Sequence, residues 1–250
     1  MKQVDEQIHI PRKKPLLGVM GGMGTQATAC FYEKLHSLQS VATEQEYLDV
    51  LVFSKPSIPD RTAYITGKSD ESPLEQLTYV ALTLETAGAT CIALPCVTSH
   101  YFYNDILENI SIPLLHIPAE TAGVIEVNGV KKVCLLATDG TLAGKVFHTT
   151  FEQNGIDILL PSEEEQSNLM KIIYDIKRGE EVPLEYLESI TAKPLSDGAE
   201  AVVLGCTELC ILADTTGDKV TTTNSIKNSG MINTIEVLAE AAIKRCRGTT

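Results

Sequence analysis

The fold of this chain is decided by the stretch Gly88-Ala-Thr-Cys-Ile-Ala-Leu-Pro-Cys96 and its near repeat, Gly198-Ala-Glu-Ala-Val-Val-Leu-Gly-Cys206. The two stretches are offset by 206 − 96 = 110 residues, and glycine, alanine, leucine and cysteine coincide in them. In each, a small-residue turn leads into an apolar run of strand length, and a cysteine follows where the run stops. The pattern predicts a duplicated strand with a thiol at its carboxyl end.

A second repeat supports the duplication. The strand and glycine segment of Leu17 to Thr25 returns in Lys132 to Thr141, at an offset of 140 − 24 = 116 residues. Both halves therefore run strand, glycine loop, helix and a later strand that ends in cysteine, which predicts an α/β chain of two domains. Open α/β sheets bind ligands outside the carboxyl ends of their strands, so we expect Cys96 and Cys206 to face one cleft and to do acid/base work on one substrate.

The composition limits the class of protein. With 250 residues, 44% of them hydrophobic and 21% charged, the chain is typical of soluble globular proteins that bury a substantial core. Its net charge of −13 argues against nucleic acid, which needs a basic face. No run approaches the roughly 18 apolar residues of a membrane helix, and the polar start, residues 1–14, is unlike a signal peptide. We therefore expect a cytoplasmic protein with a loose tail and no membrane partner.

The cysteines are seven in number, and an odd count without an export signal indicates free thiols in a reducing compartment. Cys30 lies in a helical pattern and Cys91 and Cys134 lie in apolar runs, where cysteine behaves as a small hydrophobe. A zinc site would recruit Cys91 with Cys96 or Cys206 with Cys210, but neither pair has the usual two-residue spacing. We predict no metal.

The first half begins with an arrangement that binds anions. A strand over 15–20, a glycine turn over 21–24 and a helix over 25–39 present unpaired N–H groups at the helix start. Gly22-x-Gly24-x-x-Ala27 loosely matches the dinucleotide fingerprint, but the next strand, 48–53, ends in Ser-Lys without the acid that binds ribose. A carboxylate is therefore the preferred ligand.

The loops that follow offer further candidates. Arg61 comes after the second strand and is either a ligand of the same cleft or a surface arginine paired with Asp60. A capping box over 72–75 opens a helix that Gly88 ends. A helical segment over 98–103 places Cys96 at a helix start, which lowers the pKa of a thiol. His100 is an alternative base, although a histidine beside aromatic residues is more typically packed or exposed.

The second half is predicted with less detail. A strand is expected over 112–117 and helices over 163–178 and 183–192, the last stopped by Pro194. Residues 215–230 are loop-like, and a final helix over 233–245 is expected to pack back on the first half. The predicted division is a tail over 1–15, a first α/β domain over 16–117 plus 224–250, and a second over 118–223.

Several motifs taken together resemble the cofactor-independent aspartate/glutamate racemase family. The likeness spans residues 16–245 and is carried by Leu17-Gly-Val-Met-Gly-Gly-Met-Gly24, Ile58-Pro-Asp-Arg-Thr62, Pro95-Cys96-x-Thr98, Leu135-Leu-Ala-Thr138-x-Gly-Thr141, Ile176-Lys177-x-Gly179 and Leu204-Gly-Cys206-Thr-Glu208. It implies two pseudosymmetric domains, each a mainly parallel sheet flanked by helices, with the active site between them. It also implies a homodimer that interconverts L- and D-aspartate or glutamate without pyridoxal phosphate or another cofactor.

The resemblance implies a role for individual residues. Cys96 and Cys206 would be the proton-transfer pair. Thr98 and Thr207 would hold the α-carboxylate or amino group of the substrate, and Arg61 and Lys177 would meet its carboxylates. Met23, Val97 and Thr138 would line the pocket, supported by Gly22, Gly24 and Glu208.

Two positions depart from the family pattern. Val97 stands where the family has asparagine, so one polar anchor on the substrate is absent, at a cost of about 1–3 kcal/mol for an unpaired group. Asn233 stands where an aspartate is expected. The departures keep two alternatives open: a related isomerase or decarboxylase that uses one thiol, and a weakly active or non-catalytic binder of acidic ligands.

Two thiols suit racemisation because the Cα proton leaves one face and another proton arrives on the opposite face. One sulfur must be thiolate while the other is thiol, and the two titrate as a pair. A free cysteine is only a few per cent thiolate at pH 7, so helix starts near each sulfur would supply activation. Positive charge from Arg61 and Lys177 would stabilise the developing carbanion.

Overall fold

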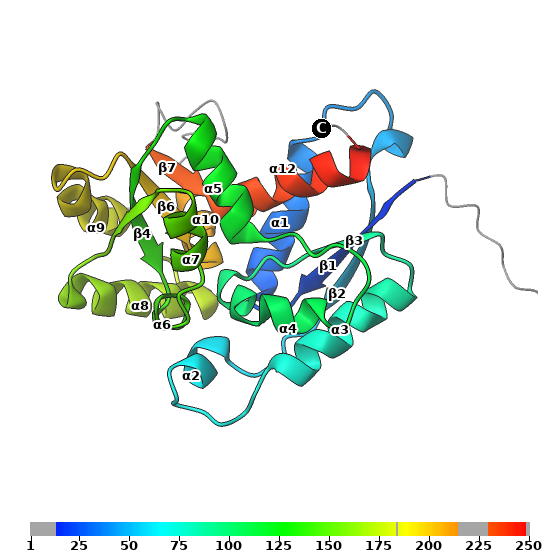
Figure 1. Cartoon of the computed structure of the whole chain (residues 1–250), viewed down its shortest axis with the longest axis horizontal. Coiled ribbons are helices and arrows are strands. Elements are labelled where there is room, and N and C mark those ends of the chain that lie inside the picture. The colour runs from blue at the N-terminus through cyan, green and yellow to red at the C-terminus, as the bar shows by residue number, and fades with distance from the viewer. Residues whose placement is uncertain (1–13, 184, 215–229, 249–250) are drawn as a thin grey trace, which may run out of the picture.

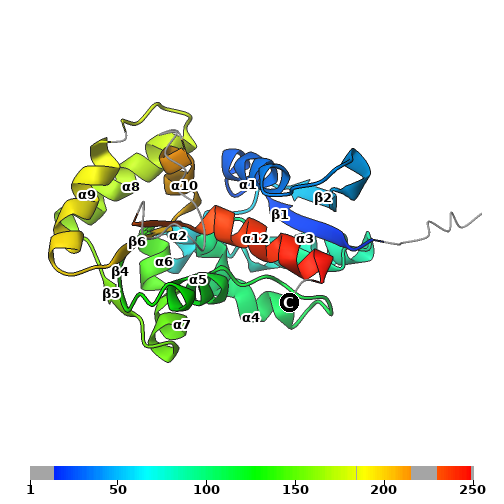
Figure 2. The ribbon, with the colours of Figure 1, turned by 90° about the horizontal axis from the view of Figure 1, so that it is seen from above.

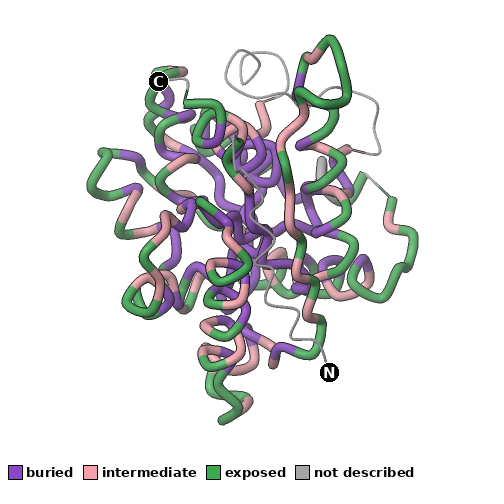
Figure 3. Tube along the Cα trace, turned by 90° about the vertical axis from the view of Figure 1, so that its right-hand side faces the viewer, coloured by how far each residue is buried: buried purple, intermediate pink, exposed green. Residues whose placement is uncertain are grey.

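The computed structural model describes residues 14–183, 185–214 and 230–248 of the chain (Figure 1). Residues 1–13 of the predicted tail and 215–229 of the predicted loop lie outside the described residues. Within the described parts, the inner strands of two sheets lie in the buried interior, and exposed residues gather on the surrounding helices, loops and outer strands (Figure 3). None of the described helices is both long and apolar enough to cross a lipid bilayer.

The first sheet contains β1 (Leu16–Gly21), β2 (Asp49–Ser54) and β3 (Cys91–Ala93). All pairs are parallel and the order is β2-β1-β3. Side chains alternate between its faces, because successive residues of a strand point to opposite sides. Leu17 and Val19 join the core of α1 (Thr25–Ser37), whereas Met20 and Ile92 join that of α3 (Leu74–Thr86). Helices therefore cover both faces.

The second sheet contains β4 (Lys132–Ala137), β5 (Asp157–Leu159), β6 (Ala201–Gly205) and β7 (Met231–Asn233), all parallel, in the order β5-β4-β6-β7. Every residue of β6 is buried, as expected for a strand covered on both faces. The flanking helices include α8 (Glu163–Lys177), α9 (Glu185–Ser196) and α10 (Thr207–Asp214). The predicted class, α/β with two parallel sheets flanked by helices, is confirmed.

The two sheets repeat one topology. In each, the first strand of the half pairs with the second on one side and with the cysteine strand on the other. Beyond β3, Leu114 forms a single parallel bridge with Ile92 at the position that β7 holds beyond β6. The homologous strands β3 and β6 thus occupy the same place in their sheets, which brings both cysteines to a carboxyl edge.

The last helix joins the halves. α12 (Thr234–Arg247) follows β7 and packs against α1 and α5 (Ile117–Val127) (Figure 2). Asn233 caps it, since its side-chain oxygen accepts hydrogen bonds from the amides of Ile235 at 3.0 Å and Glu236 at 3.1 Å. This return of the last helix agrees with the prediction. The division into domains at the proposed residues stays a prediction.

The remaining described elements are short. They are η1 (Glu44–Glu46), α2 (Arg61–Ile65), η2 (Val97–Phe102), α4 (Tyr103–Leu107), α6 (Asp139–Ala143) and α7 (His148–Gln153), of which η1 and η2 are 3₁₀ helices. The predicted glycine loop of the second half is in fact the start of α6. Thr138 caps this helix by accepting a hydrogen bond from the amide of Thr141.

The strand predicted over 112–117 is wrong. Only Leu114 pairs, through bonds from the Ile92 amide to the Pro113 carbonyl and from the Leu115 amide to the Ile92 carbonyl, both 2.8 Å. Pro113 has no N–H to donate, and α5 begins at Ile117, so the ladder stops after one bridge.

Two helix boundaries also differ from prediction. The capping box over 72–75 does not form: α3 begins at Leu74 after Pro73, and the Ser72 hydroxyl only accepts the Leu74 amide at 3.3 Å. Pro194 does not stop α9, which runs through it to Ser196. A proline in the last turn costs one intrahelical hydrogen bond, and Pro194 is buried, so its packing offsets that loss.

Candidate active site

A small pocket lies where the carboxyl ends of β3 and β6 meet, and we call it the central pocket. The first half lines it with Met23, Asp60, Arg61, Thr62, Cys96, Val97 and Thr98. The second half lines it with Thr138, Lys177, Cys206, Thr207 and Glu208. Every residue predicted to act in catalysis or substrate binding therefore lies around one cavity.

A second cavity adjoins the central pocket, and we call it the outer pocket. It has a volume of about 220 Å³ and shares Met23, Asp60, Arg61, Lys177 and Glu208 with the central one. Gly22 and Gly24, predicted as supporting residues, line this outer pocket at the start of α1. The central cavity itself measures about 10 Å³, which is room for about one water molecule. An amino acid needs the central pocket to widen, and the outer pocket is the space that adjoins it.

Cys96 is the residue immediately before η2 and is 5% exposed. Its backbone is extended, three residues after the end of β3, and its carbonyl accepts the first bond of the 3₁₀ helix, from the Ser99 amide at 3.2 Å. The Ser99 hydroxyl turns back and donates to the Cys96 sulfur at 3.0 Å. The Ser99 hydroxyl is thus a hydrogen-bond donor directed at the Cys96 sulfur.

Cys206 holds the matching position before α10 and is also 5% exposed. Its carbonyl accepts the amides of Leu209 at 3.1 Å and Cys210 at 3.3 Å, the first bonds of the helix. Its thiol donates to the Glu208 carboxylate at 3.0 Å. Burial and the negative charge of Glu208 raise the pKa of Cys206 well above its usual value, while Lys177 acts in the opposite direction.

Two cationic side chains reach the pocket from opposite halves. Arg61, at the start of α2, is 9% exposed and donates to the carbonyls of Ile58 at 3.2 Å and Pro59 at 3.0 Å. Its Nε is buried and has no hydrogen-bond partner among the described residues. A buried guanidinium with a free N–H is suited to receive a carboxylate.

Lys177 ends α8, where its ammonium group lies 5.0 Å from the centre of the Tyr174 ring. Much of its surface is exposed, although its side chain lines both pockets. Desolvation is the largest single effect and acts to lower the pKa of Lys177, but the negative charges of Glu208, Cys206 and Cys96 together outweigh it and leave this pKa raised. Lys177 therefore stays cationic at neutral pH.

Three threonine hydroxyls bind the halves together at the edge of the site. Thr98 lies 3.0 Å from both Thr138 and Thr141, and these two lie 3.0 Å from each other. Close by, Gly140 of α6 permits α2 to approach, because a Cβ there would lie 2.7 Å from the Thr62 Cα. The triangle places Thr98, from the cysteine motif of the first half, against the glycine-threonine motif of the second.

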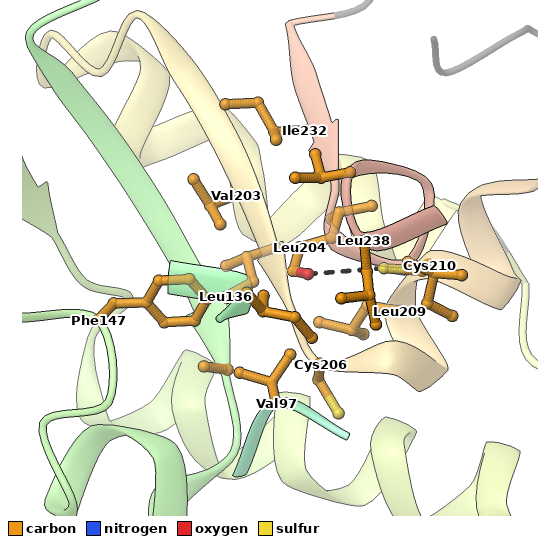
Figure 4. Packing of buried hydrophobic residues seen from close by; sticks show 14 of the residues in the cluster. Val97, Leu136, Phe147, Val203, Leu204, Cys206, Leu209, Cys210, Ile232 and Leu238 are labelled. Carbon is orange, nitrogen blue, oxygen red and sulfur yellow. Dashed lines mark hydrogen bonds between the residues drawn. The ribbon is translucent and has the colours of Figure 1, made fainter. Parts of the chain in front are cut away.

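Val97 is 2% exposed and belongs to the same hydrophobic core as Leu136 and Cys206 (Figure 4). Figure 4 shows it reaching from the first half toward these residues of the second sheet. The side chain that replaces the expected asparagine is thus packed in the core at the pocket wall, and it offers the cavity no hydrogen bond.

His100, the alternative base, lies elsewhere. It is buried, its Nε2 pairs with the Leu94 carbonyl at 3.2 Å, and it is absent from the lining of the central pocket. Burial, with His116 nearby, lowers the pKa of His100 to about 3, so it stays neutral at physiological pH. Its position is that of a packed core histidine.

The sequence reasoning missed some residues of this site. The sequence indicates Asp60 only as a surface partner of Arg61, and Thr62 only as part of a motif, yet both line the central pocket. Ser99 and Thr141 were not proposed, although their hydroxyls contact Cys96 and Thr98. The only signal in the sequence was that these residues lie close in the chain to a predicted site residue. Proximity in the chain does not show where a side chain points.

The fold and the site define a class: a duplicated α/β protein that carries one cysteine at the end of each homologous strand, on the wall of a shared pocket. The sequence profile of the Asp/Glu/Hydantoin racemase family matches residues 20–242, and the chain belongs to this family. Racemases are isomerases, so the prediction of an isomerase agrees with the family. The family acts on small amino-acid substrates.

Individual relatives agree with this placement. The broad specificity amino-acid racemase RacX of Bacillus subtilis is 25% identical over 205 residues, which are 80% of this chain and 88% of RacX. Picrophilus torridus aspartate racemase superposes with a TM-score of 0.78 at 26% identity, covering 93% of this chain and 94% of that one. An aspartate racemase homologue from Pyrococcus horikoshii gives 0.71 at 26% identity, covering 92% and 98%.

Proposed function

We propose that this protein interconverts the L- and D-forms of aspartate, glutamate or both, by proton transfer between the substrate Cα and the thiols of Cys96 and Cys206. The observation that carries the proposal is the lining of one pocket by both sulfurs, each from the equivalent strand of its own half. The similarity to aspartate racemase and to RacX favours the same reaction. No cofactor takes part in the proposed steps.

The reaction follows from the pair. One sulfur, as thiolate, accepts the Cα proton and leaves a carbanion that is conjugated with the α-carboxylate. The other, as thiol, donates its proton to the opposite face of that carbon. The protonation states of the two sulfurs are then exchanged, so the same pair serves both directions.

Positive charge near the carboxylate is the second requirement. Arg61 and Lys177 supply it from two sides of the pocket, and the start of α1 adds backbone N–H groups at the outer pocket. These positive charges stabilise the carbanion more than they stabilise the bound substrate with its Cα–H bond intact. They therefore lower the barrier to proton removal. The free Nε–H of Arg61 favours an acidic substrate.

Deuterium incorporation tests the proposal directly. Incubating L-aspartate or L-glutamate with the folded, reduced protein in D₂O is expected to give the D-isomer with deuterium at Cα, without added cofactor. Chiral chromatography with mass spectrometry measures both. A protein that binds these amino acids but leaves Cα–H intact would be a binder, and exchange without inversion would indicate chemistry with one thiol.

The homodimer and the cytoplasmic location stay predictions.

Val97→Asn tests the departure from the family pattern. If the missing polar anchor limits the reaction, the amide restores a hydrogen bond to the substrate and raises kcat/KM about ten-fold or more. Val97→Ala, which changes the size of the side chain without adding a polar group, is the control and should bring no gain. Equal or lower activity in Val97→Asn would show that the pocket has adapted to valine.

Lys177→Met tests the cationic wall. The unbranched apolar side chain keeps much of the lysine stem but removes the charge beside the developing carbanion, so kcat/KM for acidic amino acids is expected to fall about 100-fold. Lys193→Met is the matched control, since Lys193 also lies in the last turn of a helix but outside both pockets. Similar kinetics for both variants would remove Lys177 from the proposed mechanism.

A further inference from the structure

The two sulfurs of the central pocket have hydrogen bonds of opposite polarity. Cys96 accepts a hydrogen bond from the Ser99 hydroxyl at 3.0 Å. Cys206 donates one to the Glu208 carboxylate, also at 3.0 Å. The duplication makes the strands alike, but Ser99 and Glu208 differ in chemistry, so the two halves of the site are electrostatically unequal.

Opposite polarity stabilises opposite protonation states. A donor directed at a sulfur favours the thiolate, because the negative charge strengthens the bond. An ionised carboxylate beside a sulfur favours the thiol, because the thiol can donate to it whereas a thiolate would repel it. The Glu208 oxygen that accepts the hydrogen bond of the Cys206 thiol also accepts one from the Thr207 hydroxyl at 3.2 Å, which holds that carboxylate in place.

We propose that Ser99 and Glu208 are positioning residues that fix the resting state of the pair, with Cys96 as the thiolate and Cys206 as the thiol. The proposal deepens the proposed racemase reaction and rests on it for its catalytic meaning. It assigns the first step: the enantiomer whose Cα–H faces Cys96 is deprotonated by the enzyme as it rests. That turnover leaves the reversed state, with Cys96 as the thiol and Cys206 as the thiolate, which acts on the opposite enantiomer. Proton exchange between the sulfurs and solvent restores the resting state.

Other charges around the pair do not remove the inequality. Lys177 lies close enough to both sulfurs to interact with each, so it stabilises either thiolate. Arg61 and Asp60 line the same pocket and have opposite charges. Glu208 is 4% exposed, so water screens its charge little where it meets Cys206. Burial first, and then the Glu208 carboxylate, raise the pKa of Cys206, and together they outweigh Lys177 and the backbone amide of Glu208, which act in the opposite direction.

Alkylation rates test the proposal without substrate. Iodoacetamide reacts with thiolates, and the two residues have the same exposed fraction, 5%, so overall burial favours neither. We expect Cys96 to be modified at least about ten-fold faster than Cys206 at pH 7, since each unit of pKa difference changes the thiolate fraction about ten-fold. Peptide mass spectrometry separates the two sites, and equal or faster modification of Cys206 would overturn the assignment.

Variants of the two partners give the pH readout. Glu208→Gln removes the carboxylate charge and offers an amide donor, so the pH midpoint of Cys206 alkylation should fall by at least one unit. Ser99→Ala removes the donor and should raise the midpoint of Cys96, while Ser99→Thr keeps a hydroxyl and should restore it. Midpoints that do not move in correctly folded variants would overturn the proposal, because a purely structural role predicts no such change.

The test of the unequal thiols and the test of racemisation can fail independently. A protein that shows the unequal thiols but no racemisation retains the inference about Ser99 and Glu208 and loses the racemase assignment. Racemisation by a protein whose two thiols react at equal rates would retain the racemase assignment and remove the inference about Ser99 and Glu208. Cys134 serves as internal control, because it is completely buried and burial raises its pKa to about 12, so it should remain unmodified while the fold is intact.

Discussion

Replacing either Cys96 or Cys206 by serine is expected to lower racemisation about 1,000-fold, because a positioned proton-transfer group contributes about 10²–10⁴-fold and a serine hydroxyl is a far weaker acid than a thiol. Both sulfurs line the central pocket at the carboxyl ends of equivalent strands. The loss should appear in kcat rather than KM, since serine preserves the shape of the site. Chiral chromatography of initial rates measures it.

Cys30→Ser is the control for that result. Cys30 lies on α1, where its thiol donates to Asp214 at 3.6 Å, and it lines neither the central nor the outer pocket. Its replacement should leave racemisation largely intact. A large loss in Cys30→Ser together with activity in the Cys96 and Cys206 variants would overturn the site. A Cys variant that still exchanges the Cα–H of one enantiomer would show the remaining thiol acting alone.

Gly22→Ala is expected to destabilise the protein by roughly 2–4 kcal/mol and to abolish activity. Gly22 has a φ of 97°, which side chains rarely adopt, and a Cβ there would lie 2.4 Å from the Lys55 backbone nitrogen. The close approach joins the turn after β1 to the segment after β2, at the wall of the outer pocket. For a chain of this size the melting temperature should fall by about 4–16 °C.

The matched control for that substitution is Gly67→Ala. Gly67 also has a positive φ, of 71°, but no described atom outside its own chain neighbours would lie within 4 Å of a Cβ. It therefore isolates the backbone strain, about 1–2 kcal/mol, from the clash. Thermal unfolding followed by circular dichroism compares the two variants. Equal destabilisation would mean that the turn at Gly22 shifts to admit the methyl group.

Much of this architecture could be predicted from the chain because it depends on local patterns. Fully buried strands such as β4 and β6 appear as short apolar runs, and α8 shows its start in a capping box at Ser162 and its end near Gly179. The failures fall where a local signal competes with packing. Pro194 lies in a buried position that keeps α9 helical, and the strand expected over 112–117 shrinks to one bridge at Leu114.

The candidate site divides in the same way. The duplicated motifs are enough to indicate Cys96 and Cys206. The repeat and the topology of parallel sheets are enough to predict that both lie at the ends of equivalent strands. The direction of the hydrogen bonds at the two sulfurs needed coordinates, because it depends on where Ser99 turns in the 3₁₀ helix and on how Glu208 folds back from α10. Val97 is likewise a core residue because residues of the second sheet pack with it, and the sequence around Val97 does not show that contact.

The sequence by itself determined that this protein is a duplicated α/β chain with a thiol at the end of each central repeat, since apolar periodicity and repeated motifs are properties of the chain alone. Only the tertiary structure decided that side chains from both halves, Arg61 and Lys177 among them, line one narrow pocket, and that its two thiols have unlike partners. The physical reason is that a pocket and its electrostatics depend on side-chain directions across more than a hundred residues of chain, which no local pattern records.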